Sequence, residues 1–332
     1  MQWDYMGNQW AVEHLRRHIH EDAPRHAYLI CGPAGIGRRT LALRFAMALN
    51  CTQAAEKGDI CGECRACVQL AKLGHPDLEV IQANQPAGQL KVDQIRELQH
   101  RLSLAPYEAR YRIALLLNFE RANPSAANAL LKTLEEPPER VILLLTADSP
   151  DSLLPTIVSR CEVILLRPLE TQVLAGLLQA RLGIDTTQAL IYAHLSNGCP
   201  GLALRLQSQP ELMQDWNALL QEYVRLLSDT QIERFAAAEA LAKEKDKQRL
   251  ISTLSCWMSF WRDVILVQGG LKGKLTNVQF ESQIQAVSSK VAWQEALSAL
   301  KEIQKTLTLL DTNVNPRLAL EVLLTNMPSL RN

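Results

Sequence analysis

Two sets of residues near the start of the chain have types and spacings that could do chemistry. The first is the glycine-rich stretch CGPAGIGRRTLA, residues 31–42, which follows an apolar run and precedes an apolar-periodic segment. A phosphate-binding loop occupies this position between a strand and a helix, where backbone amides and the helix N-terminus cradle phosphates. Gly32 and Gly37 fit that pattern and Gly35 adds flexibility, whereas the glycine spacing excludes the dinucleotide-binding fingerprint.

The loop lacks the side chains that nucleotide hydrolysis needs. Arg38 stands where the pattern requires a phosphate-binding lysine, and Arg39 stands where a hydroxyl would hold Mg²⁺, so a second cation repels the ion. The apolar run RIALLL, residues 112–117, should end in a carboxylate, but Asn118 follows it and the first acid is Glu120. We expect a remnant phosphate loop that neither hydrolyses nor binds ATP, with a plain glycine-rich turn as the alternative.

The second set is a cysteine cluster. Cys51, Cys61, Cys64 and Cys67 supply four thiols, the last three at C-x-x-C spacings that let one turn of backbone present adjacent ligands to a tetrahedral ion. This pattern predicts one structural zinc ion, with redox cysteines or merely buried neighbouring cysteines as the alternatives. His75 could also be a ligand, but four thiols already close the coordination shell, so a catalytic zinc is not expected.

Composition limits the class of protein. The chain has 332 residues, with 35 Lys and Arg balanced by 35 Asp and Glu, so it lacks the broad basic surface of a protein that grips nucleic acid alone. Its length predicts two or three domains. The N-terminal stretch shows no signal-peptide pattern, and apolar runs such as VILLL are too short to span a bilayer, so we expect a cytoplasmic protein.

Hydrophobic patterning predicts an α/β domain followed by helical domains. Between residues 26 and 167, apolar runs alternate with amphipathic stretches, which is typical of a parallel sheet with crossover helices. The expected strands are AYLIC, LEVIQ, RIALLL, VILLLTA and EVILL. A helix should begin after Asn123, with Pro124 at its first position, and stop at Pro137.

The remainder reads as helical. Segments at about 170–182 and 186–196 are helical and lead to the turn SNGCPG, and only helical periodicity follows residue 209. Tryptophans within the last part have Leu and Ile neighbours at helical spacing, which favours core or subunit packing over base stacking. They are Trp216, Trp257, Trp261 and Trp293.

Four segments then occur in order along the chain: HAYLICGPAGIG, the cysteine cluster, AANALLKTLEEPP and LLPTIVSRC. In this combination the chain resembles the clamp-loader subunits of bacterial DNA polymerase III, which are AAA+ proteins, strongly over residues 26–167 and in outline beyond. The motor subunits of that family, gamma/tau, carry an intact loop lysine, an acidic pair and a sensor arginine. This chain has Arg38 in the loop, Leu117 and Asn118 at the acidic pair, and Gly201 at the sensor position. It therefore resembles the degenerate, catalytically inactive subunit type, the stator.

The resemblance implies an architecture and a set of partners. It implies an AAA+ P-loop-type domain over 1–167 with a zinc-binding insertion at 51–67, a small helical lid over 168–208 and a helical collar over 209–332. It also implies a five-subunit ring with gamma/tau motor subunits and a delta subunit, within the DNA polymerase III holoenzyme, a nucleotidyltransferase complex. Through the ring the chain would act on the sliding clamp and primer-template DNA, with no membrane partner.

Arg160 is the expected functional side chain. It lies in LLPTIVSRC just before an expected strand, where a lone arginine is usually only a solvated surface charge. The resemblance implies instead that it points in trans at the ATP of a neighbouring subunit. Thr146 aligns with the sensor-1 position of the family and, without an acidic pair beside it, is expected to be structural.

Two other functions compete with the inactive stator. One is an active clamp-loader ATPase of the gamma/tau type, which a turnover assay on the isolated chain distinguishes. The other is a stand-alone zinc-containing DNA-binding protein, which the balanced charge disfavours and which a DNA-binding assay at moderate salt distinguishes.

Overall fold

The computed structural model describes residues 3–84, 88–244, 246–310 and 314–330. The chain divides into two compact units. Unit 1 consists of Met1–Leu177 and Gly198–Leu202, and unit 2 consists of Leu178–Asn197 and Ala203–Asn332. Residues 168–208, expected as a separate lid, are shared between the two units, so the three-domain boundaries stay a prediction.

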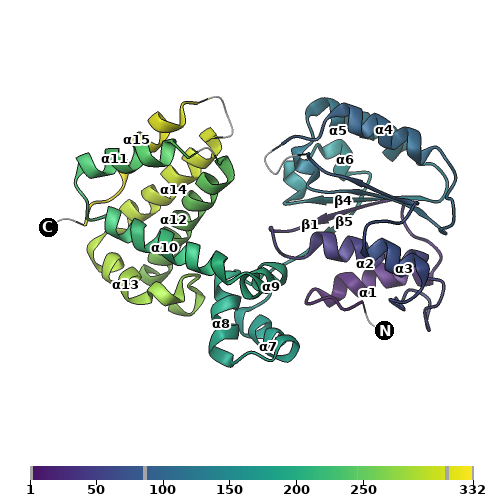
Figure 1. The fold of residues 1–332 in the computed structure, drawn as a ribbon, viewed down its shortest axis with the longest axis horizontal. Coiled ribbons are helices and arrows are strands. Elements are labelled where there is room, and N and C mark those ends of the chain that lie inside the picture. Colours follow the sequence, from purple (N-terminus) through teal and green to yellow (C-terminus); the bar gives the residue numbers. More distant parts are fainter. Residues whose placement is uncertain (1–2, 85–87, 245, 311–313, 331–332) are drawn as a thin grey trace. The chain divides into compact units, whose positions relative to one another are not determined.

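Unit 1 is built on a parallel five-stranded sheet in the order β2-β3-β4-β1-β5 (Figure 1). The α/β fold class and all five expected strands are confirmed. The strands are β1 (Ala27–Cys31), β2 (Leu78–Ile81), β3 (Arg112–Leu116), β4 (Val141–Ala147) and β5 (Glu162–Leu165). The helices are α1 (Gln9–His20), α2 (Arg38–Asn50), α3 (Arg65–Ala71), α4 (Val92–Leu102), α5 (Pro124–Glu135) and α6 (Pro155–Val158), with short 3-10 turns at Phe119–Arg121 and Pro150–Ser152.

Each face of the sheet packs against its own helices. Because successive side chains of a strand point to opposite faces, Tyr28 and Ile30 join the core beneath α1 and α2, whereas Leu29 and Cys31 join the core beneath α4 and α5. Figure 1 shows α1, α2 and α3 on one side of the sheet and α4, α5 and α6 on the other. Strands buried on both faces read as continuous apolar runs, which is why the sequence showed them clearly.

The predicted ends of α5 are confirmed. The side chain of Asn123 accepts a hydrogen bond from the N–H of Ala126 at 2.8 Å, Pro124 stands at the first position, and the helix ends at Glu135 before the two prolines. The cap satisfies one of the amide groups that a helix start leaves without an intrahelical partner.

Unit 2 is helical. The expected helices near 170–182 and 186–196 are α7 (Thr171–Leu182), which crosses the division between the units, and α8 (Thr186–Leu195). The others are α9 (Pro200–Ser208), which also crosses it, α10 (Pro210–Leu226), α11 (Gln231–Ala242), α12 (Lys247–Gln268), α13 (Glu281–Lys290), α14 (Trp293–Leu310) and α15 (Pro316–Asn326), with 3-10 turns at Lys272–Lys274 and Val278–Phe280. Trp257 and Trp261 lie in the core as expected, whereas Trp293 is 48% exposed, so for that residue subunit packing stays a prediction.

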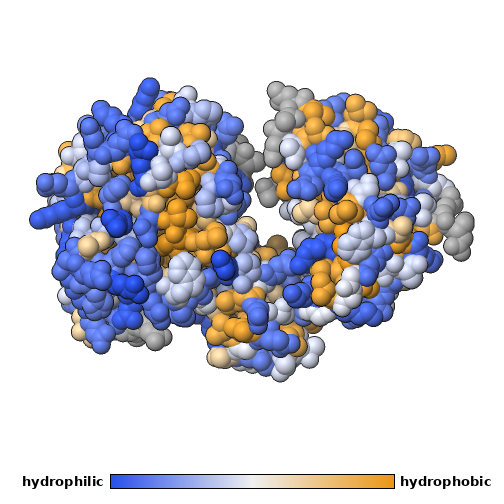
Figure 2. Space-filling model, turned by 180° about the vertical axis from the view of Figure 1, so that it is seen from behind, coloured by the Kyte–Doolittle hydropathy of each residue, from blue (hydrophilic) through white to orange (hydrophobic). Residues whose placement is uncertain are grey.

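One helix is apolar enough to cross a membrane by length and composition alone. It is the stretch Arg249–Gln268 of α12, and half of its most apolar window is buried among the other helices. Counting continuous apolar runs missed it because Ser255 and Ser259 interrupt the pattern. Its buried face, which includes Phe260 and Trp261, identifies it as the central helix of the unit 2 core. The molecular face in Figure 2 is mostly hydrophilic with local hydrophobic patches.

Candidate functional site

The glycine-rich loop joins β1 to α2, as the sequence predicts. Gly32, Gly35 and Gly37 have φ angles of 149°, 81° and 107°, in the region that favours glycine over other residues. Gly37 is the residue that precedes the helix, and α2 begins at Arg38. The loop therefore keeps glycines at the positions whose backbone needs them.

Arg38 is engaged by side chains of its own unit. Its Nη1 donates to Oδ1 of Asp148 at 2.5 Å and its Nη2 donates to Oδ1 of Asn118 at 3.3 Å. The Arg38 side chain is only 10% exposed. Its positive charge thus already faces a carboxylate at the place where the phosphate-loop pattern has a lysine. The neighbouring Arg39 is exposed.

Packing against α9 and the N-terminal segment closes the loop. The carbonyl oxygen of Gly35 accepts a hydrogen bond from the N–H of Leu202 at 3.2 Å, and a Cβ on Gly35 would meet Cβ of Leu202 at 2.8 Å. A Cβ on Gly201 would meet the Gly35 carbonyl oxygen at 2.8 Å, so a sensor arginine there would clash. The Tyr5 hydroxyl also reaches the carbonyl oxygen of Ile36 at 3.4 Å.

The end of β3 offers an amide in place of a metal-binding acid. Leu117 is buried, and Asn118 has a left-handed backbone with its N–H bonded to Oγ1 of Thr146 at 2.9 Å. Thr146 is 1% exposed and thus has the structural contact expected of it. Burial raises the pKa of Glu120, the first acid after the strand, and the Asp148 charge also acts to raise it while Arg38 opposes.

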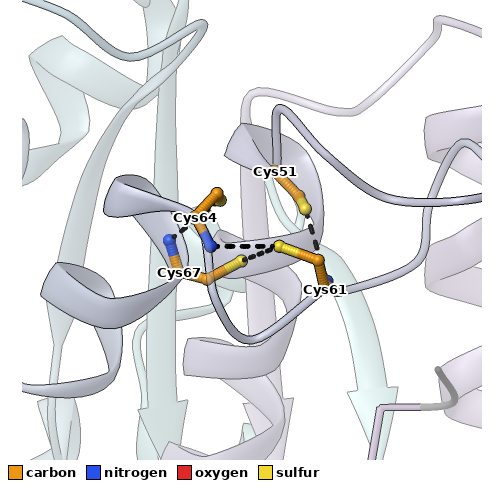
Figure 3. A group of neighbouring side chains, drawn as sticks. All are labelled: Cys51, Cys61, Cys64 and Cys67. Carbon is orange, nitrogen blue, oxygen red and sulfur yellow. Dashed lines mark hydrogen bonds between the residues drawn. The ribbon is translucent and has the colours of Figure 1, made fainter.

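The four cysteines of the cluster converge (Figure 3). Cys51 follows the end of α2, Cys61 lies in the connecting loop, and Cys64 and Cys67 stand at and inside the start of α3. Their sulfur atoms all lie within 4.8 Å of one another, which is close enough to hold a metal ion. The Sγ atoms of Cys61 and Cys67 are 3.9 Å apart.

Backbone amides point at the sulfur atoms of the cluster. The N–H groups of Cys61, Cys64 and Cys67 donate to Sγ of Cys51, Cys61 and Cys64 at 3.4, 3.2 and 3.5 Å. Burial acts to raise the pKa of the Cys64 thiol, but hydrogen bonds from the Thr52 and Cys67 backbones and the neighbouring thiols outweigh it and lower the pKa to about 6. Donors that favour thiolate fit a metal site, because thiolate is the form that binds a metal.

His75 does not join the cluster. Its Nε2 lies 3.7 Å from Oε1 of Glu108, and its Nδ1 accepts a hydrogen bond from the N–H of Asp77 at 3.0 Å. These contacts leave both ring nitrogens with partners outside the four thiols. The ligand set predicted from cysteine spacing therefore needs no histidine.

Arg160 lies between α6 and β5 on the surface of unit 1. Its Nη2 donates to Oε1 of Glu135 at 2.8 Å, and its Nη1 donates to the carbonyl oxygen of Thr156 at 2.9 Å. The side chain is 35% exposed, so part of the guanidinium remains open to a partner. Glu135 ends α5, so the two segments that carry the family motifs meet at this ion pair.

Sequence reasoning missed the residues that close the phosphate loop. Asp148 follows β4, 110 residues after Arg38, Tyr5 precedes α1, and Leu202 lies in α9. The sequence predicted β1 and β4 as strands but not their order, and it is their pairing in the sheet that brings the end of β4 beside the loop. No local pattern in the sequence identified Tyr5 or Leu202 as a contact.

A family model described as DNA polymerase III, delta subunit, matches residues 7–170, and one described as its C terminal part matches residues 210–328. The chain is 36% identical over 315 residues to DNA polymerase III subunit delta' of Pseudomonas aeruginosa, with 92% of each protein covered. It is 27% identical over 343 residues to subunit tau of Bacillus subtilis, with 96% of this chain and 60% of that relative covered. A Thermotoga maritima structure described as a DNA polymerase III gamma subunit-related protein aligns with a TM-score of 0.45 and 19% identity, covering 95% of this chain and 97% of that one.

Proposed function

The chain belongs to the DNA polymerase III delta' family, and from this premise we propose that it is the catalytically inactive stator of the clamp loader. The observation that carries the proposal is the pairing of Arg38 with Asp148 at 2.5 Å. This ion pair neutralises the loop charge that would meet a phosphate. The Gly35 carbonyl accepts a hydrogen bond from the N–H of Leu202, so the backbone of the loop is already engaged within the chain.

Loss of the metal ligands supports the same proposal. Mg²⁺ bridges the phosphates in P-loop enzymes and is held by a loop hydroxyl and an acid at the end of a strand. Here those positions are Arg39, Leu117 and Asn118. A chain without the lysine, the hydroxyl or the acid has no means to neutralise the charge that develops during phosphoryl transfer, so we expect neither ATP hydrolysis nor stable ATP binding.

Arg160 is proposed to serve a neighbouring motor subunit as an arginine finger. A planar guanidinium can contact two oxygens of a transferring phosphoryl group and stabilise its charge from across an interface. The side chain is partly exposed, and Glu135 and the Thr156 carbonyl hold it in one orientation. In the ring, the phosphoryl group would replace or share the contact with Glu135.

The cluster is proposed to hold one structural zinc ion through Cys51, Cys61, Cys64 and Cys67. Four thiolates close a tetrahedral shell and leave no position for a reacting water. The ion would fix α3 and the preceding loop against the end of α2, because the ligands come from all three. Its role would be to fold this insertion.

The remaining proposals concern the assembly. We propose a ring containing gamma/tau motor subunits and a delta subunit, through which the chain acts on the sliding clamp and primer-template DNA in the cytoplasm. The proposed domains are an AAA+ domain over 1–167, a lid over 168–208 and a collar over 209–332. In such a ring the helices of unit 2 would supply the collar contacts.

An active ATPase of the tau type is the competing function, because the chain also matches subunit tau over almost its whole length. Steady-state ATP turnover by the purified chain with Mg²⁺ decides between the two. The stator proposal expects none, and turnover above that of a buffer blank would overturn it.

The finger is tested in the reconstituted ring. We expect Arg160→Ala to lower DNA-stimulated ATPase and clamp loading severalfold without changing assembly, since only one of several sites depends on it. A finger in GTPases contributes roughly 10³ to 10⁵ in rate at its own site. Arg160→Lys should rescue poorly because a point charge lacks the fork geometry.

Glu135→Gln is the matched control. It breaks the same ion pair but leaves the guanidinium in place. If Arg160→Ala assembles normally and the ring hydrolyses ATP and loads clamps at the wild-type rate, Arg160 is only a surface charge and the finger is wrong.

A further inference from the structure

Two histidines and a glutamate come together at the edge of the sheet in unit 1, outside the loop and the cysteine cluster. His14 and His18 lie one turn apart on α1, and Glu162 is the first residue of β5, the edge strand. The His14 Nε2 and Glu162 Oε1 atoms are 3.0 Å apart, and the two imidazole ring centroids are 4.4 Å apart. One potential ligand atom from each residue lies within 4.8 Å of the other two.

This donor set matches divalent transition metals. Two histidines at i and i+4 on one helix face can bind the same zinc ion, and a carboxylate is a common third ligand. A tetrahedral ion with bonds of about 2.0–2.1 Å places its ligands about 3.3 Å apart. The separation of His14 and Glu162 is close to that spacing, and a ligand atom of His18 lies within 4.8 Å of both.

A hydrogen bond to Tyr28 fixes the orientation of the His18 ring. Its Nδ1 lies 2.8 Å from the Tyr28 hydroxyl, which also accepts a hydrogen bond from the backbone N–H of Arg25 at 2.9 Å. Tyr28 is fully buried in β1 and cannot move far. A histidine that ligates a metal through one nitrogen usually bonds a second partner through the other, which fixes the tautomer. With Nδ1 bonded to Tyr28, Nε2 is the nitrogen that remains for an ion.

We propose that His14, His18 and Glu162 form a second metal site, which takes a divalent transition-metal ion such as Zn²⁺. Three protein ligands leave a fourth position for water. All three side chains are partly exposed, so the ion can exchange with solvent. The site would join α1 to the edge strand and differs in donor chemistry from the four thiols. It does not depend on the function proposed above.

Metal stoichiometry tests the site in the full chain produced without a polyhistidine tag. After equilibrium dialysis against buffered Zn²⁺, we expect two ions per wild-type chain, of which a mild chelator removes one. His14→Ala and Glu162→Gln should each lose the exchangeable ion and retain the other. His20→Ala is the matched control, because His20 is exposed at the end of the same helix, and it should keep both ions.

Two further measurements identify the ligands. Cobalt bound at the exchangeable site should lack the intense thiolate charge-transfer absorption expected of the cysteine cluster. Tyr28→Phe should weaken exchangeable binding about ten- to hundredfold, the usual effect of removing a partner of a ligating histidine. The proposal is overturned if the wild-type chain holds no exchangeable ion, or if His14→Ala and Glu162→Gln bind it as the wild type does.

Discussion

The phosphate loop and the cysteine cluster lie at the two ends of one helix. The loop runs into the N-terminus of α2 at Arg38, and Cys51 follows its C-terminus. In the loop the glycine backbone is kept while the charged and hydroxyl groups of a nucleotide site are replaced. In the cluster the reactive atoms themselves are kept, and backbone N–H groups point at them.

The difference between the loop and the cluster shows that a backbone with the conformation of a binding loop does not by itself indicate a bound ligand. The loop glycines have contacts within the chain that require them: Gly35 packs on Leu202, and Gly37 lies against Tyr5. The cysteines also pack in the core of unit 1, but packing does not require four sulfur atoms within 4.8 Å of one another. The fold therefore accounts for the loop glycines, whereas we propose that a bound ion accounts for the cysteine cluster.

The largest effect is expected from removing one ligand of the cluster. Cys64→Ser should abolish the chelator-resistant zinc ion and lower the free energy of unfolding of unit 1 by on the order of 5 kcal/mol, since structural zinc ions bind peptides with about 10–16 kcal/mol. Elemental analysis and hydrogen exchange of residues 51–75 measure the two effects. Cys161→Ser is the control, because Cys161 lies outside the cluster and should leave the zinc in place. Full zinc content in Cys64→Ser would contradict the site.

The next largest effect is expected at Asp77, a buried carboxylate that is not part of the cysteine cluster. The carboxylate of Asp77 accepts N–H bonds from Tyr107, Glu108 and Ala109 at 2.7, 2.9 and 2.9 Å. Burial acts to raise the pKa of Asp77, but these donors and the Arg112 guanidinium outweigh it and hold the pKa below its usual value. Asp77→Asn leaves buried donors without acceptors and should cost about 3–4 kcal/mol at pH 7.

The sign of the pH dependence follows from the lowered pKa of Asp77. A carboxyl whose pKa is depressed by folding stabilises the protein above its unfolded pKa of about 3.9, and loses that contribution as the pH falls through the folded pKa. The stability difference between wild type and Asp77→Asn should therefore be constant from pH 5 to 7 and shrink below about pH 4. Denaturant titrations at each pH measure it. A difference that does not change with pH would show that the charge of Asp77 is not involved.

Much of the fold could be predicted from the sequence, for a physical reason. Strands buried on both faces, such as β1 and β4, are continuous apolar runs, and the caps of α5 act through residues three positions apart. Such signals are local. The division into units gives no local signal. It falls within α7 and α9, whose packing partners lie far away in the sequence.

The candidate site shows the same limit. The cysteine spacing identified the four residues whose sulfur atoms converge, because their geometry is set by one loop and the first turn of α3, and their role as metal ligands stays a prediction. The partners of Arg38 and Arg160 were not identifiable, since Asp148 and Glu135 are 110 and 25 residues away. Charge pairs on a surface depend on tertiary placement, which no local pattern encodes.

A smaller effect tests whether packing explains the loop glycines. Gly35→Ala forces a non-glycine residue into a φ of 81° and places its Cβ 2.8 Å from Cβ of Leu202. We expect a loss of about 2–3 kcal/mol in the free energy of unfolding, from backbone strain and the clash together. Gly183→Ala is the matched control, because its φ is 66° and its Cβ would meet no described heavy atom within 4 Å. Equal losses in both variants would show that the contact with Leu202 contributes nothing.

The smallest effect is expected at Arg38, where one substitution restores the lysine of the phosphate-loop pattern. Arg38→Lys restores the family's loop lysine but loses the bond from Nη2 to Asn118, while an ammonium can still face Asp148. Because Asp148 is 59% exposed, solvent screens the pair, and the change in stability should be below about 1 kcal/mol. ATP turnover should stay at the buffer level, since Arg39 and Asn118 still leave Mg²⁺ without its ligands. Isothermal titration with ATP and a turnover assay measure this outcome. If Arg38→Lys binds ATP tightly, the packing of Leu202 on the loop does not exclude nucleotide, and the loop is a site disabled by one side chain.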